Sequence, residues 1–160
     1  MDTLWQELTL GFGSGHQVVL VLVRLIVAAL CGALVGLQRQ KSHKPAGLRT
    51  HLLVCLTSAL VVVACAGMGM NVDGQARVIQ GLLTGIGFIG AGSILKLSQE
   101  HHIKGLTTAA GLWMMAAIGI ACGVGTIGIA LIGTALTLMV LALVKEVEDY
   151  PHRNHHTEGQ

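Results

Sequence analysis

Charged and aromatic side chains are scarce in this sequence. Only 11% of its 160 residues are charged and 3% are aromatic, whereas a soluble globular domain has roughly 25% charged residues. This composition excludes a soluble domain, and the mean hydropathy of +0.70 excludes a disordered chain. A net charge of only +2 and so few aromatic residues argue against nucleic-acid binding. The 52% of apolar residues predict a membrane protein instead.

Paired cysteines and intramembrane acids are also missing. The four cysteines form no CxxC pair and lie in apolar stretches, where a thiol behaves as a small hydrophobe. We therefore expect no disulfide, no metal site and no cofactor. All eight carboxylates lie outside the apolar tracts, although a path for Mg²⁺ is expected to contain an acidic ring or an intramembrane Asp or Glu. This weakens an ion-transport function, although backbone carbonyls freed by glycines could substitute.

The apolar tracts are long enough to cross a membrane. A spanning helix needs about 20 residues, and three tracts of that size lie at 18–37, 52–72 and 78–95. A fourth uncharged tract, 105–144, is twice as long and must fold back, best at Gly123-Val124-Gly125-Thr126. The sequence thus predicts an all-α membrane protein with a C-terminal helical hairpin and five transmembrane helices, at about 18–37, 52–72, 78–97, 105–123 and 126–144.

Basic residues predict the orientation. Eight of the ten lie on alternate connections, which belong on the cytoplasmic side, so the N-terminus should be outside and the C-terminus inside. Residues 1–17, with Leu4, Trp5 and Leu8 at helical spacing, suggest a short interfacial helix. Residues 18–144 form the membrane domain. The tail, 145–160, contains His152, His155 and His156, which could bind a transition metal, but a solvated tail is the simpler interpretation.

Glycines recur at helical spacing. There are 22 of them, about twice the average usage, and small residues four apart let membrane helices approach closely. We expect the third span, which has the most, at the centre of the bundle, and 85–92 could be irregular there. Packing is the simpler role, and a binding site is the alternative. The predicted packing glycines are Gly32, Gly36, Gly81, Gly85, Gly87, Gly90, Gly92, Gly119 and Gly123.

Arg24 is the one charge deep in a predicted span. An intramembrane arginine is a functional-site hypothesis by default. The structural alternative is that it reaches outward or pairs with Asp73 in the outer connection, and the sequence leaves both open.

The sequence predicts an anion site at the cytoplasmic face. The second and fourth spans both begin there, near Arg49-Thr50-His51 and near Lys104, and helix N-termini carry partial positive charge. Thr107 and Thr108 are candidate caps, and Arg39 and Lys44 add positive charge. A phosphate or an acidic lipid headgroup fits this surface better than a metal ion. The alternative is that these residues only set the orientation.

A catalytic site is not expected. Ser93 follows a run of glycines, but a nucleophilic serine needs a base within hydrogen-bond reach, and no histidine lies inside a predicted span.

Several motifs in fixed order resemble the MgtC/SapB family of membrane proteins. The first runs from Gly32 to His51 and includes Gly36-Leu37-Gln38-Arg39-Gln40 and Ala46-Gly47-Leu48-Arg49-Thr50. Arg77, Gln80 and Gly81 then lead into the glycine run that ends at Gly92. Lys104-Gly105-Leu106-Thr107-Thr108 follows, with Leu112-Trp113 and Ala117-Ile118-Gly119 after it, so the resemblance covers roughly residues 20–125.

This resemblance implies a multi-pass protein of the bacterial inner membrane that serves growth under Mg²⁺ limitation and, in pathogens, virulence. It favours regulation of a membrane partner, such as a P-type Mg²⁺ ATPase or ATP synthase, over transport by the protein itself. Two departures bear on this. Position 38 is Gln where the family commonly has Glu, which puts any acid-dependent role there in doubt. Many relatives continue into a soluble C-terminal domain that this sequence does not contain, so we expect its regulation to be absent or supplied by another chain.

The leading hypothesis is a non-enzymatic membrane factor that binds and modulates another complex, with a possible homo-oligomer. An ion channel or transporter is the alternative. The residues that we expect to bind a partner or an anion are Arg24, Arg39, Arg49, His51, Arg77, Gln80, Lys104, Thr107, Thr108 and Trp113.

Overall fold

Helices make up almost all of the structure. The computed structural model describes residues 15–96 and 103–153, with side chains for 15–94 and 104–143. The predicted interfacial residues Leu4, Trp5 and Leu8, and His155 and His156 of the tail, lie outside the described residues. Within them the helices are α2 (Gly15–Lys41), α3 (Leu48–Gly67), α4 (Val72–Gly92), α5 (Leu106–Val124) and α6 (Ile127–Arg153). The two-residue strands β1 (Leu95–Lys96) and β2 (Ile103–Lys104) pair antiparallel between α4 and α5.

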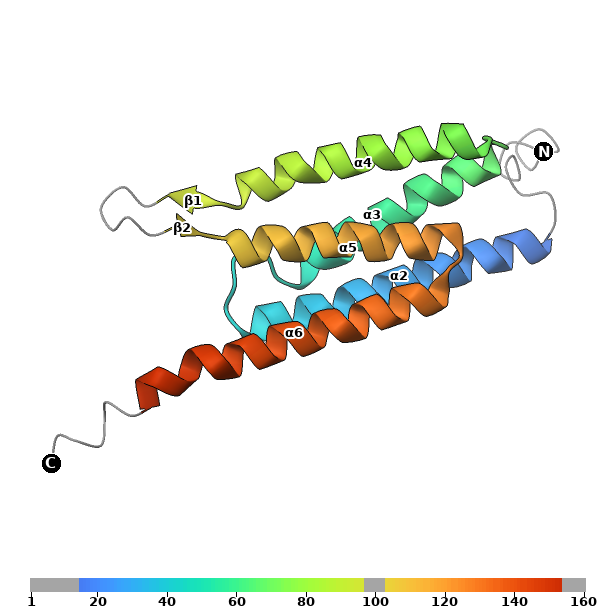
Figure 1. Cartoon of the computed structure of the whole chain (residues 1–160). Coiled ribbons are helices and arrows are strands. Elements are labelled where there is room, and N and C mark those ends of the chain that lie inside the picture. Colours follow the sequence, from blue (N-terminus) through green and yellow to red (C-terminus); the bar gives the residue numbers. More distant parts are fainter. Residues whose placement is uncertain (1–14, 97–102, 154–160) are drawn as a thin grey trace, which may run out of the picture.

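Length and hydropathy agree with a membrane location. Three of the described helices, α2, α3 and α5, are long and apolar enough to cross a bilayer, and α6 contains a shorter apolar helix, Ile127–Leu143. The helices run back and forth, so that α2 begins at the end of the bundle opposite to the end of α6 (Figure 1). The predicted all-helical membrane fold is therefore confirmed. Five spans and an outside N-terminus stay predictions.

The predicted turn between the last two helices is present. α5 ends at Val124, α6 begins at Ile127, and Gly125 has a φ of 100°, a conformation that glycine adopts without a steric cost. The backbone N–H of Gly125 donates to the Cys122 carbonyl at 3.0 Å and that of Thr126 to the Ala121 carbonyl at 2.9 Å. These bonds satisfy the last carbonyls of α5, which is why the forty-residue tract divides here.

Helix α3 lies between two glycine faces. A Cβ placed on Gly32 or Gly36 of α2 would lie 2.8 Å from the Leu52 Cα or 2.7 Å from the Leu48 Cα, respectively. From the other side, a Cβ on Gly123 of α5 would lie 2.7 Å from the Ala59 carbonyl oxygen. These separations leave no room for a larger side chain. α2, α3 and α5 thus form the tightly packed centre of the bundle.

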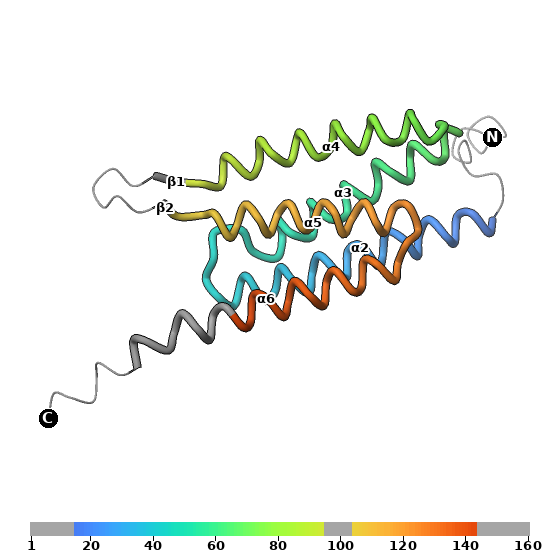
Figure 2. The backbone as a smooth tube through the Cα atoms, viewed as in Figure 1, coloured from blue at the N-terminus to red at the C-terminus, as the bar shows by residue number. Residues whose placement is uncertain are grey.

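Helix α4 lies at the edge of the bundle, which corrects the prediction that the third span is central. It packs on α5 and more weakly on α3, away from α2 and α6 (Figure 2). Only Ile86 and Gly90 of α4 are buried. The helix is also unbroken, so 85–92 is not irregular. Nothing lies within 4 Å of a Cβ built on Gly81, Gly85, Gly87 or Gly92, so their predicted packing role is wrong within the described chain.

The reason for this placement lies in the other face of α4. Ile86 is buried, and Leu83 and Ile79 are half-buried where they line a groove together with Trp113 of α5. Gly90 also faces α5, where a Cβ would lie 3.7 Å from the Ala109 Cβ, whereas Gly81, Gly85 and Gly92 lie on the open side of the helix. Spacing of four residues identifies a small face but does not say whether anything packs on it.

The packing predicts different effects for two glycine substitutions, one in the packed centre and one on the open side of α4. Gly119→Ala should lower the free energy of unfolding by about 1–3 kcal/mol, because the new methyl meets the Cys55 carbonyl of α3 and backbone cannot move aside. Gly81→Ala, in open space on α4, should not destabilise the protein. Thermal unfolding of both variants in detergent would measure this. Equal losses would contradict the described packing.

Candidate functional site

Arg39 and Thr108 join the last turn of α2 to the first turn of α5. Arg39 Nη2 donates to Thr108 Oγ1 at 2.9 Å, and the two residues are 3% and 2% exposed. The Arg39 Nε is buried without a hydrogen-bond partner among the described residues. A buried guanidinium held by one neutral hydroxyl is an unusual arrangement, because burying an unpaired charge is costly.

His51 lies beside this pair, inside the first turn of α3, and is completely buried. α3 begins four residues before the predicted span 52–72 and therefore includes this histidine. Its Nδ1 lies 2.9 Å from the Gly47 carbonyl, which can only accept, so Nδ1 carries the proton. Its Nε2 faces Gly111, where a Cβ would lie 3.4 Å away, and has no partner among the described residues. Glycine at this position makes room for the ring.

The other residues of the predicted anion site are not brought together. Arg49, Lys104 and Thr107 are exposed, and the structure does not pair them with Arg39. The predicted threonine caps are wrong, because α3 begins after Gly47 and α5 after Gly105, and neither N-cap has a side-chain hydrogen bond. Thr108 uses its hydroxyl for Arg39 instead.

Arg24 lies at the opposite end of the bundle, against the turn between α5 and α6. Its Nη1 donates to the Gly123 carbonyl at 3.0 Å, and a Cβ on Gly125 would lie 2.6 Å from its Nη2. It thus binds the C-terminus of α5, where the helix dipole favours a cation. Neither expected structural role, reaching outward or pairing with Asp73, describes this contact.

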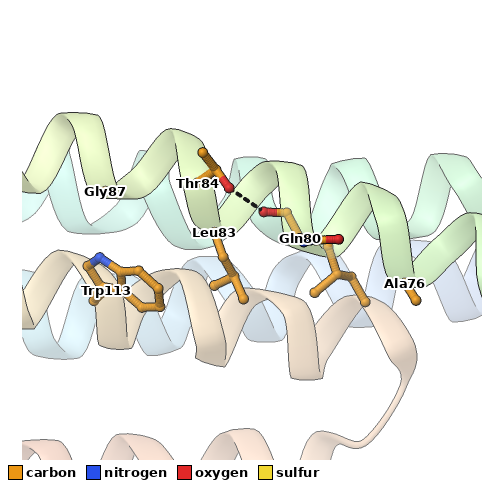
Figure 3. Close-up of a pocket in the computed structure, with 7 residues that line it drawn as sticks. Ala76, Gln80, Leu83, Thr84, Gly87 and Trp113 are labelled. Carbon is orange, nitrogen blue, oxygen red and sulfur yellow. Dashed lines mark hydrogen bonds between the residues drawn. The ribbon is translucent and has the colours of Figure 1, made fainter.

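A shallow groove of about 420 Å³ runs between α4 and α5. Gln80 and Thr84 of α4 and Trp113 of α5 contribute polar atoms to its otherwise apolar lining, and Trp113 lies beneath Gly87 (Figure 3). The Thr84 hydroxyl donates to the Gln80 backbone carbonyl at 2.9 Å, so it is satisfied within its own helix. The Gln80 side chain is exposed, as is nearby Arg77. Gln80 and Trp113, separated by 33 positions in sequence, are thus brought to one surface.

Neither a metal site nor an activated serine is found among the described residues. No three His, Cys, Asp or Glu side chains among them are arranged to hold a metal ion. Ser93 donates its hydroxyl to the Gly90 carbonyl at 2.7 Å, in its own helix. Sequence reasoning missed one polar atom of interest, the Gln38 Oε1, which is buried without a partner among the described residues. The only available signal was its place beside Arg39.

These features define a class: a helical membrane protein with a glycine-packed centre, a buried arginine near one end and an open groove on one side. Comparison with known proteins gives the family. Residues 25–150 match the model of the MgtC family, and the chain belongs to that family.

The chain is similar to proteins from three different organisms. The chain is 41% identical over 136 residues to Protein SrpB of Synechococcus elongatus, covering 78% of this chain and 75% of that protein. It is 42% identical over 134 residues to the Putative magnesium transporter YhiD of Escherichia coli K12, covering 79% of this chain and 61% of that protein. For Protein MgtC of Salmonella typhimurium the identity is 38% over 125 residues, or 78% of this chain and 52% of that protein. The match thus spans between half and three quarters of these relatives. No solved structure shows significant similarity to the chain.

The contact of Arg24 predicts a loss of stability. Arg24→Met keeps most of the stem but removes the charge and the hydrogen bond to Gly123, and should cost about 1–2 kcal/mol of unfolding free energy. Arg77→Met, an exposed arginine at the same end, should change it by less than about 0.5 kcal/mol. Thermal unfolding in detergent compares the two. Indistinguishable variants would contradict a capping role for Arg24.

A second prediction concerns Thr108. Thr108→Val leaves Arg39 buried without its acceptor and should cost about 1–3 kcal/mol. Adding Arg39→Met should recover part of this loss, because the uncompensated charge is gone. Thr84→Val, whose hydroxyl bonds only within α4, serves as the control and should be nearly neutral. A double variant less stable than Thr108→Val alone would refute this account.

Proposed function

We propose that this chain is a non-enzymatic factor of the bacterial inner membrane that acts in adaptation to Mg²⁺ limitation by binding another membrane complex. The orientation proposed with it has the N-terminus outside and the C-terminus in the cytoplasm. Membership of the MgtC family supports the first part. The open glycine face of α4 is the observation that carries the proposed binding to another membrane complex.

A glycine face toward lipid has little use in a lone protein. Glycine weakens a helix relative to alanine, and lipid gives helices no hydrophobic reason to associate, so a stripe of small residues is useful where another helix approaches. Gly81, Gly85 and Gly92 of α4 have no neighbour within 4 Å of a Cβ, and Phe88 between them is 84% exposed. The exposed amide of Gln80 adds a hydrogen-bonding group in the same region. These features favour a partner on this face.

The occupant that fits is a transmembrane helix of a larger complex. Small residues would admit its backbone closely, and Gln80 would bond to a polar group on it. A P-type Mg²⁺ ATPase and ATP synthase are the candidates that family resemblance suggests. A second copy of this chain is a distinguishable outcome of the test.

Ion transport is the competing function, because one relative carries the name putative magnesium transporter. The centre of the bundle argues against transport. Buried side chains fill the space there between α2, α3 and α5, among them Cys31, Cys55, Met115 and Cys122. A path there would have to open between apolar side chains.

The test uses crosslinking in the native membrane. A photoreactive residue in place of Phe88 should join the chain to a larger membrane protein, whereas the same residue in place of Ile132 on α6, which is 63% exposed, should not. Gly81→Leu and Gly85→Leu should abolish both the Phe88 crosslink and growth at low Mg²⁺ in a strain that depends on this chain. Gly128→Leu on α6, equally open, should preserve both.

Three results would overturn the proposal. Equal crosslinking from Phe88 and Ile132 would show that the α4 face is not a specific contact. Saturable Mg²⁺ uptake into proteoliposomes that contain only this protein would make it a transporter. A crosslinked product of twice the chain's mass would replace the larger partner by a second copy.

A further inference from the structure

The two buried or half-buried arginines lie in opposite electrostatic environments. Arg24 contacts the C-terminus of α5, where free carbonyls carry partial negative charge. Arg39 contacts Thr108 in the first turn of α5, where free N–H groups carry partial positive charge. The C-terminus of its own helix, α2, favours the charge of Arg39. The N-terminus of α5 opposes it.

The N-terminus of α3 adds to the positive field. α3 begins at Leu48 and ends its first turn at His51, which packs beside α2 and α5. Both α3 and α5 follow a glycine N-cap, so no cap side chain accepts from their first N–H groups. At Gly105 no other residue fits, because a Cβ would overlap the Ser93 carbonyl. Two uncapped helix N-termini and one guanidinium therefore meet at the same end of the bundle.

The side chains that the structure describes supply no negative charge there. Asp73 is the only acid whose side chain the structure describes, and it lies in the first turn of α4, at the opposite end. Arg39 is nevertheless 3% exposed, and its Nε has no acceptor among the described residues. A guanidinium buried this far is normally compensated by an anion with several oxygen acceptors.

His51 holds this arrangement in place and does not itself bind an anion. With Nδ1–H donating to the Gly47 carbonyl, its Nε2 presents a lone pair, which would repel an anionic oxygen. It is a positioning residue that fixes Gly47 at the start of α3. Arg49 and Thr107, in the first turns of α3 and α5, are exposed.

We infer that Arg39 and the first turns of α3 and α5 bind a phosphate group. The guanidinium offers two donors to one phosphate, and the free backbone N–H groups of the helix N-termini offer more. The phosphate can belong to a phospholipid headgroup or be inorganic phosphate, since both present the same oxygens. The site is separate from the α4 face and does not depend on the proposed partner.

The experiment follows backbone amides of the wild-type protein, so it needs no variant to fold. Protein labelled with ¹⁵N-threonine in neutral detergent is titrated with phosphatidic acid, with diacylglycerol as the phosphate-free control, and separately with inorganic phosphate at constant ionic strength. The Thr107 and Thr108 amides should shift saturably. Those of Thr134 and Thr137, buried in α6, should not move.

The probes separate the two sources. Saturation by phosphatidic acid alone assigns a lipid headgroup, and saturation by inorganic phosphate as well assigns a phosphate site open to solution. No saturable shift at Thr107 and Thr108 with either probe, or an equal response to diacylglycerol, overturns the inference.

A matched pair of variants then tests the guanidinium. Arg39→Gln should weaken phosphate binding at least tenfold, because the charge-assisted bonds are lost. Arg24→Gln, an arginine at the far end, should leave the affinity unchanged. Equal affinity in folded Arg39→Gln would overturn the role of Arg39. If that variant does not fold, the wild-type titration still decides whether the site exists.

Discussion

The backbone of α3 can approach two neighbours only because glycines face it on both sides. Gly32 and Gly36 of α2 meet Leu52 and Leu48, and Gly123 of α5 meets Ala59. In lipid this proximity, through dispersion and close backbone contact, is the main source of helix association. The consequence is a three-helix centre in which little can be added without moving a backbone. α4 and α6 are attached to it from outside.

Close packing of the centre also determines what the two arginines can reach. Arg24 and Arg39 both lie on α2, but they contact the two ends of α5, at Gly123 and Thr108. α2 and α5 must lie near each other along most of their length for this to occur. The same helix therefore offers a negative end to one arginine and a positive end to the other. Arg24 is thus bonded to a helix C-terminus, whereas the charge of Arg39 has no acidic partner among the described side chains.

Much of the fold could be predicted because its signals are local. The forty-residue tract had to fold back, and Gly125 marks the place, since its φ of 100° suits glycine. The position of α4 could not be predicted, because spacing of four residues reveals a small face but not its partner. Burial of His51 was missed for a similar reason. It depends on Gly36 and Gly111, from two other helices, and only the fold brings them beside the ring.

The basic residues that predict the orientation lie at the same end of the bundle as Arg39. Lys41, Lys44 and Arg49 are at the end of the bundle where Arg39 lies, and in the proposed orientation this end faces the cytoplasm. The cytoplasmic leaflet is rich in anionic lipid, and the cytoplasm contains phosphate. A basic surface would thus concentrate anions near the buried guanidinium of Arg39. Orientation residues and a phosphate site need not be alternatives, because the exposed cations can attract the group that the buried arginine then binds.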